Sequence, residues 1–200
     1  MIHDVIDVWL TVLNPLKQAE LLTAVYGLVR TGKIQVDEKV YNVPKLLTSP
    51  EFEECSSLDE GLLLNSNERA VIFVQGERAV RQPARSFRKY ASNIRVVVWY
   101  DESKFFTTNK VNLSGAFLVR LLDLLEAGKP GIHGAYTNIE FSNASIVEGW
   151  TAFNGYNFIE ETGYLREPYR AFVIEGTLTF YLNKYDCQDP ITIVSSSGNC

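Results

Sequence analysis

The sequence predicts an α+β fold: a mostly antiparallel sheet with helices packed on one face. Tyr169–Asn183 (YRAFVIEGTLTFYLN) alternates between apolar and mixed positions, which is the period-two pattern of a long strand with one apolar face. Arg69–Gln75 (RAVIFVQ) and Asn93–Asp101 (NIRVVVWYD) are β-branched and aromatic, which indicates two further strands, the second of them central in the sheet. Asn112–Ala127 carries the broad leucine-rich stripe of a helix that lies across such a sheet.

The length and composition favour a single domain. A chain of 200 residues with 46% hydrophobic and 22% charged residues can bury one sizeable core. We predict one α+β domain over residues 1–183, with an irregular insertion at about 37–68 and a basic extension at 76–92. Residues 184–200 are predicted to be a C-terminal tail.

The N-terminal part reads as helical. Residues 2–13 place apolar side chains at helical spacing, and Asn14-Pro15 is a helix-start signal. A second helical pattern runs over residues 16–29 and ends before Gly32, where a C-terminal glycine belongs. We therefore expect two short helices, or one helix kinked at Pro15.

Shorter elements fill the rest of the chain. Lys33–Val36 and Lys39–Val43 predict a short hairpin. Thr137–Phe141 and Tyr156–Glu160 predict strands, whereas the glycines of Gly128–Gly134 predict a turn.

Composition also bounds the environment of the protein. The formal net charge of -5 argues against wholesale nucleic-acid binding but leaves room for a local basic patch. Cys55, Cys187 and Cys200 form no C-x-x-C pair, which favours free thiols in a reducing compartment, with a Cys187–Cys200 pair as the alternative. Asp4 and Asp7 interrupt the only N-terminal apolar stretch, so we expect no signal peptide and no membrane association.

Catalytic and metal-binding patterns are scarce. The only histidines are His3 and His133, and the sequence contains no nucleophile elbow, zinc-protease motif or phosphate loop. The adjacent carboxylates of Glu160 and Glu161 would point to different sides, so they form no natural acid/base pair. The sequence therefore predicts a protein that is not an enzyme and uses neither metal nor cofactor.

The most distinctive chemical feature is a basic segment, Arg78–Lys89. It contains no acidic residue and five basic ones: Arg78, Arg81, Arg85, Arg88 and Lys89. A solvated surface loop is one interpretation of such a run. The other is a patch that faces phosphate or an acidic protein surface.

An acidic segment, Glu51–Glu60, offers a complementary surface in the same chain. Its acidic residues are Glu51, Glu53, Glu54, Asp59 and Glu60. Complementary segments on one subunit are what a head-to-tail ring contact uses. The sequence therefore suggests that both segments belong to a subunit or partner interface.

An aromatic series lies between these strands and the C-terminal one. Its members are Trp150, Phe153, Tyr156, Phe158 and Tyr164. Aromatic side chains can stack on the bases of single-stranded nucleic acid, but no basic residue lies among these five. Core and interface packing is therefore the favoured interpretation.

The order of elements resembles the tail terminator, or tail completion, proteins of long-tailed bacteriophages. An N-terminal helix precedes the strands RAVIFVQG and NIRVVVWYD, which a long extension joins. The helix NLSGAFLVRLLDLLEAG then crosses the sheet, and the polar turn ETGYLREPYR leads into a final alternating strand. The resemblance covers roughly residues 1–183 and lies in pattern and order, whereas the 37–68 insertion and the tail after Asn183 depart from the compact family pattern.

The resemblance implies a structural virion protein that forms a ring, typically a hexamer, at the head-proximal end of the tail tube. Such a ring stops tube polymerisation and meets the tube protein on one side and the neck or connector proteins on the other. The arginines of the basic segment would then serve ring contacts or face DNA in the channel. The alternative is a non-catalytic nucleic-acid-binding or accessory module that uses residues 78–89.

Overall fold

The structure, a computed structural model, has the predicted α+β class. It describes residues 2–36, 38–46, 68–83, 88–106, 112–133, 136–149, 153, 156 and 167–182. In chain order the helical elements are α1 (Ile2–Leu10), η1 (Thr11–Leu13), α2 (Asn14–Gln18), η3 (Glu102–Phe105) and α3 (Ser114–Glu126). The strands are β1 (Ala24–Val36), β2 (Lys39–Leu46), β3 (Ala70–Gly76), β4 (Val80–Gln82), β5 (Arg88–Asp101), β6 (Lys129–His133), β7 (Tyr136–Glu148) and β8 (Tyr169–Leu182).

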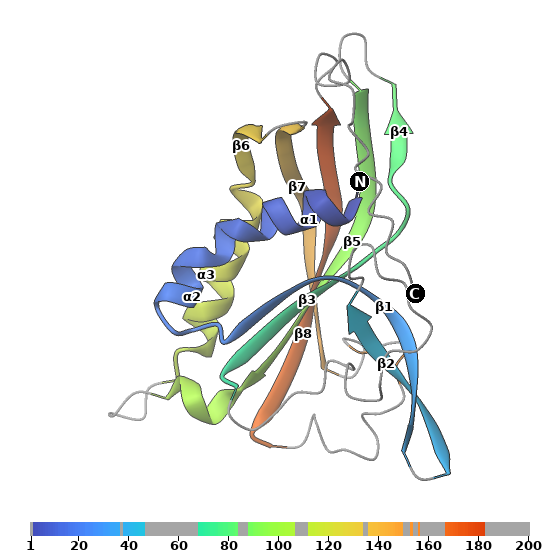
Figure 1. Cartoon of the computed structure of the whole chain (residues 1–200). Helices are drawn as coiled ribbons and strands as arrows, with labels where there is room; N and C mark the ends of the chain where they lie inside the picture. Colours follow the sequence, from blue (N-terminus) through green and yellow to red (C-terminus); the bar gives the residue numbers. More distant parts are fainter. Residues whose placement is uncertain are drawn as a thin grey trace, which may run out of the picture.

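One sheet runs through the whole molecule (Figure 1). Its described strands follow the order β2-β1-β3-β5-β8-β7-β6, and β4 pairs with β5 past the end of β3. Among the described pairings, β1 and β3 run parallel and the other neighbours run antiparallel. The helices α1 and α3 lie across the same face of the sheet, as the sequence predicted.

Alternation along β5 and β8 divides the interior into two cores. Even-numbered residues of both strands point toward the helices and enter the larger core, in keeping with the alternation seen in the sequence. These residues are Ile94, Val96, Val98, Phe172, Ile174, Leu178 and Phe180. Each buried side chain of this size contributes about 1.5–3 kcal/mol relative to an exposed one.

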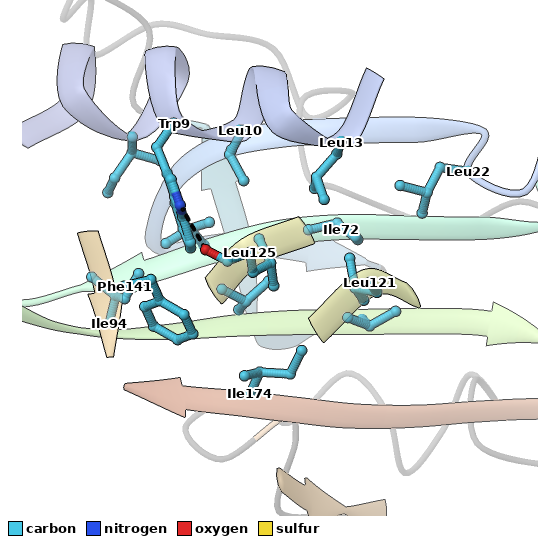
Figure 2. Packing of buried hydrophobic residues seen from close by; sticks show 14 of the residues in the cluster. Trp9, Leu10, Leu13, Leu22, Ile72, Ile94, Leu121, Leu125, Phe141 and Ile174 are labelled. Atoms are coloured by element: carbon cyan, nitrogen blue, oxygen red, sulfur yellow. Dashed lines mark hydrogen bonds between the residues drawn. The ribbon is translucent and has the colours of Figure 1, made fainter. Parts of the chain in front are cut away.

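Trp9 ties α1 to both α3 and the sheet (Figure 2). Its side chain is fully buried, and its ring lies 5.1 Å from that of Phe141 on β7. The indole Nε1 donates a hydrogen bond to the Leu125 carbonyl oxygen at 3.3 Å, in the last turn of α3. That oxygen lies where a helix has no further backbone donors of its own, so the bond satisfies a polar group at the helix end.

The second core lies on the other face and is smaller. Odd-numbered residues of the central strands, such as Val97, Trp99 and Val173, pack there against Phe153 and Tyr156. The core role predicted for the aromatic series is therefore confirmed for these two residues. The remaining members, Trp150, Phe158 and Tyr164, lie outside the described residues.

The predicted second helix over residues 16–29 is wrong beyond its first turn. The helix α2 ends at Gln18, Glu20 takes a left-handed conformation with φ 57°, and β1 begins at Ala24. Leu28 belongs to the larger core and Val29 to the smaller, so these neighbours are buried on opposite faces. Only a strand between two layers presents adjacent residues in this way, and pairing with β3 outweighs the helical spacing.

The predicted hairpin near residue 37 is confirmed, and its strands are longer than expected. β1 and β2 pair from Val36↔Lys39 to Val29↔Leu46. The irregular insertion at 37–68 therefore begins with a strand, and its remainder, 47–67, lies outside the described residues.

The turn predicted at Gly128–Gly134 is also wrong, because Lys129–His133 forms β6 and pairs with β7. Gly128 does end α3 as its helix-stop pattern indicates, with φ +62°. A Cβ there would lie 2.7 Å from the Ile139 carbonyl oxygen, so both the backbone angle and the close approach require glycine.

The remaining predicted strands have different outcomes. Thr137–Phe141 lies within β7, which continues to Glu148. Tyr156 is described but belongs to no strand, and 157–160 lie outside the described residues, as do 184–200 and the three cysteines.

We predict that Gly176→Ala destabilises the protein by about 1–3 kcal/mol, because a methyl group there overpacks the larger core. The added Cβ would lie 2.5 Å from ring atoms of Phe141 and 2.9 Å from the Ser142 carbonyl oxygen. Gly115→Ala in α3 is the matched control, since no atom lies within 4 Å of its added Cβ. Urea denaturation of both variants measures the effect, and equal midpoints for Gly176→Ala and the parent chain would contradict the prediction.

Candidate interaction surface

A β-bulge creates the surface on which the basic residues lie. Gly76 pairs with Ile94 and Val80 pairs with Ala91, so the β3–β4 segment advances four residues while β5 advances three. The extra residue sits around Glu77, whose N–H donates to the Asn93 carbonyl oxygen at 3.1 Å. Ser92 Oγ donates to the Glu77 carbonyl oxygen at 2.7 Å, which stabilises the bulge from the partner strand. A bulge bends a strand and increases its twist.

Beyond the bulge, β5 and β8 extend together past the helix layer (Figure 1). The two strands pair without a register shift from Arg88↔Leu182 to Asp101↔Tyr169. The basic extension predicted at 76–92 is therefore a continuation of the sheet, formed by β4 and the first residues of β5. This backbone pairing gives its side chains fixed positions.

Four of the five predicted basic residues lie on this extension. Arg78, Arg81 and Arg88 are exposed, whereas Lys89 is half-buried with its Nζ 5.7 Å from the centre of the Tyr181 ring. Within the described part of the chain none of these four side chains forms an ion pair. Their positive charge is therefore available to a partner.

The cations lie on both faces of the extension. Arg81 pairs with Tyr90, whose ring stacks on Phe180 of the larger core, 5.5 Å between centroids. Arg81 is therefore on the helix side, while Lys89 shares the opposite side with Tyr181. One residue beyond the bulge, Val80 is 61% exposed, an apolar position between the arginines.

A polar cleft of about 490 Å³ adjoins the extension on the face opposite the helices. Across its floor Arg95 donates from Nε to Glu175 Oε1 at 2.9 Å and from a terminal nitrogen to Gln75 Oε1 at 2.8 Å. Gln75 Nε2 in turn contacts the Tyr156 hydroxyl at 2.6 Å, which links the cleft to the smaller core. The Arg95–Glu175 pair is partly exposed and contributes about 0–1 kcal/mol.

The cleft suits polar contact better than catalysis. Its charged floor is neutralised by the Arg95–Glu175 pair, and the remaining side chains are amides, hydroxyls and the exposed Glu77. Burial raises the pKa of Tyr156, against the opposing effect of hydrogen bonds with Gln75 and Thr31, so its hydroxyl stays neutral. The cleft therefore holds no pair of carboxylates with divergent environments that would divide acid and base roles.

Other titratable residues form local pairs. His3 Nδ1 lies 3.1 Å from Asp7 Oδ2, one turn along α1, and burial raises the pKa of Asp7. The side chain of His133 lies outside the described set. Over the described ranges, no cluster of three or more histidine, cysteine or acidic residues is placed to hold a metal ion. No described helix combines the length and apolar character needed to cross a membrane.

The predicted acidic half of the interface cannot be compared with these positions. Arg85 and the whole acidic segment Glu51–Glu60 lie outside the described residues. The structure thus places Arg78, Arg81, Arg88 and Lys89 on one extension and leaves their pairing with the acidic segment a prediction.

The sequence interpretation missed the network of Gln75, Arg95 and Glu175. Each of these residues is a polar interruption in an otherwise apolar strand, and the three strands were recognised. That shared signal could have marked them, but only the register Gln75↔Arg95↔Glu175 shows that they meet.

Comparison with known proteins adds no relative. No protein-family model, no curated protein sequence and no solved structure matches the chain.

We predict that Tyr156→Phe lessens the loss of stability at alkaline pH. A tyrosine whose pKa is raised by folding stabilises the native state fully below its unfolded pKa, near 10, and that contribution is lost as pH rises through the folded value. Unfolding free energies between about pH 9 and 11 should therefore fall less steeply in the variant. Tyr26 and Tyr100, whose pKa values burial also raises, keep part of the slope.

Phe153→Leu is the control for that experiment, since it perturbs the same core without removing an ionisable group. It should lower stability at every pH and leave the alkaline slope unchanged. An unchanged slope in Tyr156→Phe would contradict the assignment.

Proposed function

We propose that this protein is a structural virion protein that forms a ring at the head-proximal end of a phage tail. In this role the ring stops polymerisation of the tail tube and joins the tail to the neck or connector. The protein contacts copies of itself, the tube protein and connector proteins, and DNA passes through its channel. It carries out no catalysis.

The observation that carries the proposal is a pair of projections from one sheet (Figure 1). The β1–β2 hairpin leaves the sheet in one direction, and the β4–β5 extension leaves it in another. A subunit with two different projections suits a heterologous, head-to-tail contact, in which each copy offers a different surface to each neighbour. Such a contact closes into a ring when the rotation between copies divides a full turn.

The element order supports the same proposal. The strands on which the resemblance rests, β3, β5 and β8, are neighbours at the centre of the sheet, and α3 crosses them beside α1. The alternative features, the long extension and the closing strand, also meet, because the start of β5 pairs with the end of β8.

Charge supports an interface on the extension. The chain carries a formal net charge of -5, yet the extension presents Arg78, Arg81 and Arg88 to solvent. A cationic projection on an acidic subunit attracts a neighbouring copy and orients its approach.

We expect the purified chain to form closed rings at high protein concentration. Native mass spectrometry gives the number of subunits, and negative-stain images show closure. Arg78→Glu combined with Arg88→Glu should abolish the rings, because it reverses the charge of the projection. A chain that stays monomeric at high concentration and is missing from purified particles would overturn the proposal.

Lys17→Glu combined with Arg120→Glu is the matched control. It makes the same change in net charge at exposed positions of α2 and α3, away from the extension. This control should form rings like the parent chain.

A second candidate function, nucleic-acid binding in its own right, is favoured by the same exposed cations. If the extension binds phosphate, affinity for duplex DNA falls with salt, and Arg81→Ala with Arg88→Ala lowers the logarithmic salt slope by roughly 0.9 per lost contact. Arg120→Ala on α3 is the control and should leave the slope unchanged. Fluorescence anisotropy across salt concentrations measures it, and weak, salt-insensitive binding would exclude this function.

A further inference from the structure

The outer edge of β4 is an open sheet edge. Among the described strands β4 pairs with β5 alone, whereas β3 is flanked by both β1 and β5. β1 follows β3 as far as Val29↔Gln75 and then continues into the hairpin with β2. Figure 1 shows β4 at the margin of the sheet, beyond the point where β1 departs.

The register identifies the backbone groups that face outward. The N–H of Glu77 bonds to Asn93, so the odd-numbered residues of β5 direct their backbone groups toward β3 and β4. Ala91 and Lys89 therefore bond to their partners Val80 and Gln82. The N–H and C=O of Arg81, the residue between them, point away from β5 to the open edge.

The side chains around this edge favour an acidic strand. Arg78 and Arg81 are exposed and make no ion pair within the described residues, and Val80 presents an apolar surface. A strand that adds to such an edge gains main-chain hydrogen bonds, while its own side chains determine the specificity. Carboxylates along the added strand would neutralise cations that would otherwise repel a basic one.

We propose that this edge accepts the acidic segment Glu51–Glu60 of a second copy of the chain as an added strand. This inference rests on the proposed ring and specifies how its subunits join. The segment holds Glu51, Glu53, Glu54, Asp59 and Glu60 within ten residues, the densest acidic run in the chain. Its charge complements the basic edge, and one such contact per neighbour is the heterologous arrangement that builds a ring.

The course of the chain favours a second copy over the same one. β2 runs antiparallel to β1, and β1 runs parallel to β3, so the chain leaves Leu46 heading away from β4. It re-enters the described structure at Glu68, just before the start of β3 and at the end opposite to β4. The ends of the intervening segment thus direct it away from the edge of its own subunit.

Cross-linking tests the contact directly. Val80→Cys is made in a chain that also carries Cys187→Ser and Cys200→Ser, so that Cys55 is the only other thiol. A short bismaleimide should join Cys55 of one copy to the thiol at position 80 of the next, giving a ladder of linked subunits. Peptide mass spectrometry identifies the linked positions. Val119→Cys in the same background is the control, since Val119 is also 61% exposed but lies on α3.

A proline substitution tests the backbone contact separately. Arg81→Pro removes the outward N–H and leaves the pairing of Val80 and Gln82 with β5 in place, because proline is tolerated at the outer side of an edge strand. Arg81→Gln removes the same charge and keeps the N–H. The proline variant should need about tenfold or more higher protein concentration to assemble than the glutamine variant. Circular dichroism checks that both are folded, and the cross-link carries the test if the proline variant is not.

The outcomes separate this inference from the ring itself. An intermolecular link between Cys55 and position 80, with no ladder from Val119→Cys, supports it. Rings that assemble without that link, a link formed only within one chain, or equal effects of proline and glutamine overturn it and leave the ring proposal standing. A parent chain that never forms rings overturns the proposed function and this inference together.

Discussion

The pairing of β5 with β8 is the constraint on which the other layers depend. Their ladder continues unbroken from Arg88↔Leu182 to Asp101↔Tyr169, and it supplies both cores because alternate residues point to opposite faces. A one-residue slip would exchange the residues that meet the helices with those that meet Phe153 and Tyr156. The bulky apolar side chains of both faces therefore hold the register, and Trp9 closes the larger core only because Phe141 is held in place beside β8.

Irregularities on either side of this ladder shape the interaction surface. One extra residue between Gly76 and Val80 ends the match with β3 and re-aims the chain, so that β4 continues along β5 with an open outer edge. β7 carries a comparable shift between Ser142 and Ser145 on the opposite side of β8. The central strands thus remain straight in register while their neighbours bend, which produces an extension that is rigid at its centre and adaptable at its margin.

Charge is distributed unevenly over this framework. Within the described chain, acidic and basic side chains pair across the cleft, as in Arg95 with Glu175, and beside η3, as in Arg170 with Glu102. The arginines of the extension have no such described partner. A net acidic subunit that concentrates unpaired cations at one open sheet edge is suited to contact with another acidic surface, whether a second copy or a nucleic-acid backbone.

The sequence by itself determined the α+β class, the strands at 70–76 and 169–182, the helix over 114–126 and the basic segment, because each depends on local periodicity or composition. Tertiary structure decided the rest. Residues 24–29 form a strand in spite of helical spacing, since β3 offers a pairing edge and Leu28 and Val29 are buried on opposite faces. The lysine and proline that follow Gly128 join β7 instead of turning. Only the register brings Gln75, Arg95 and Glu175 together and turns the backbone of Arg81 outward, because these relations are set between strands far apart in the chain.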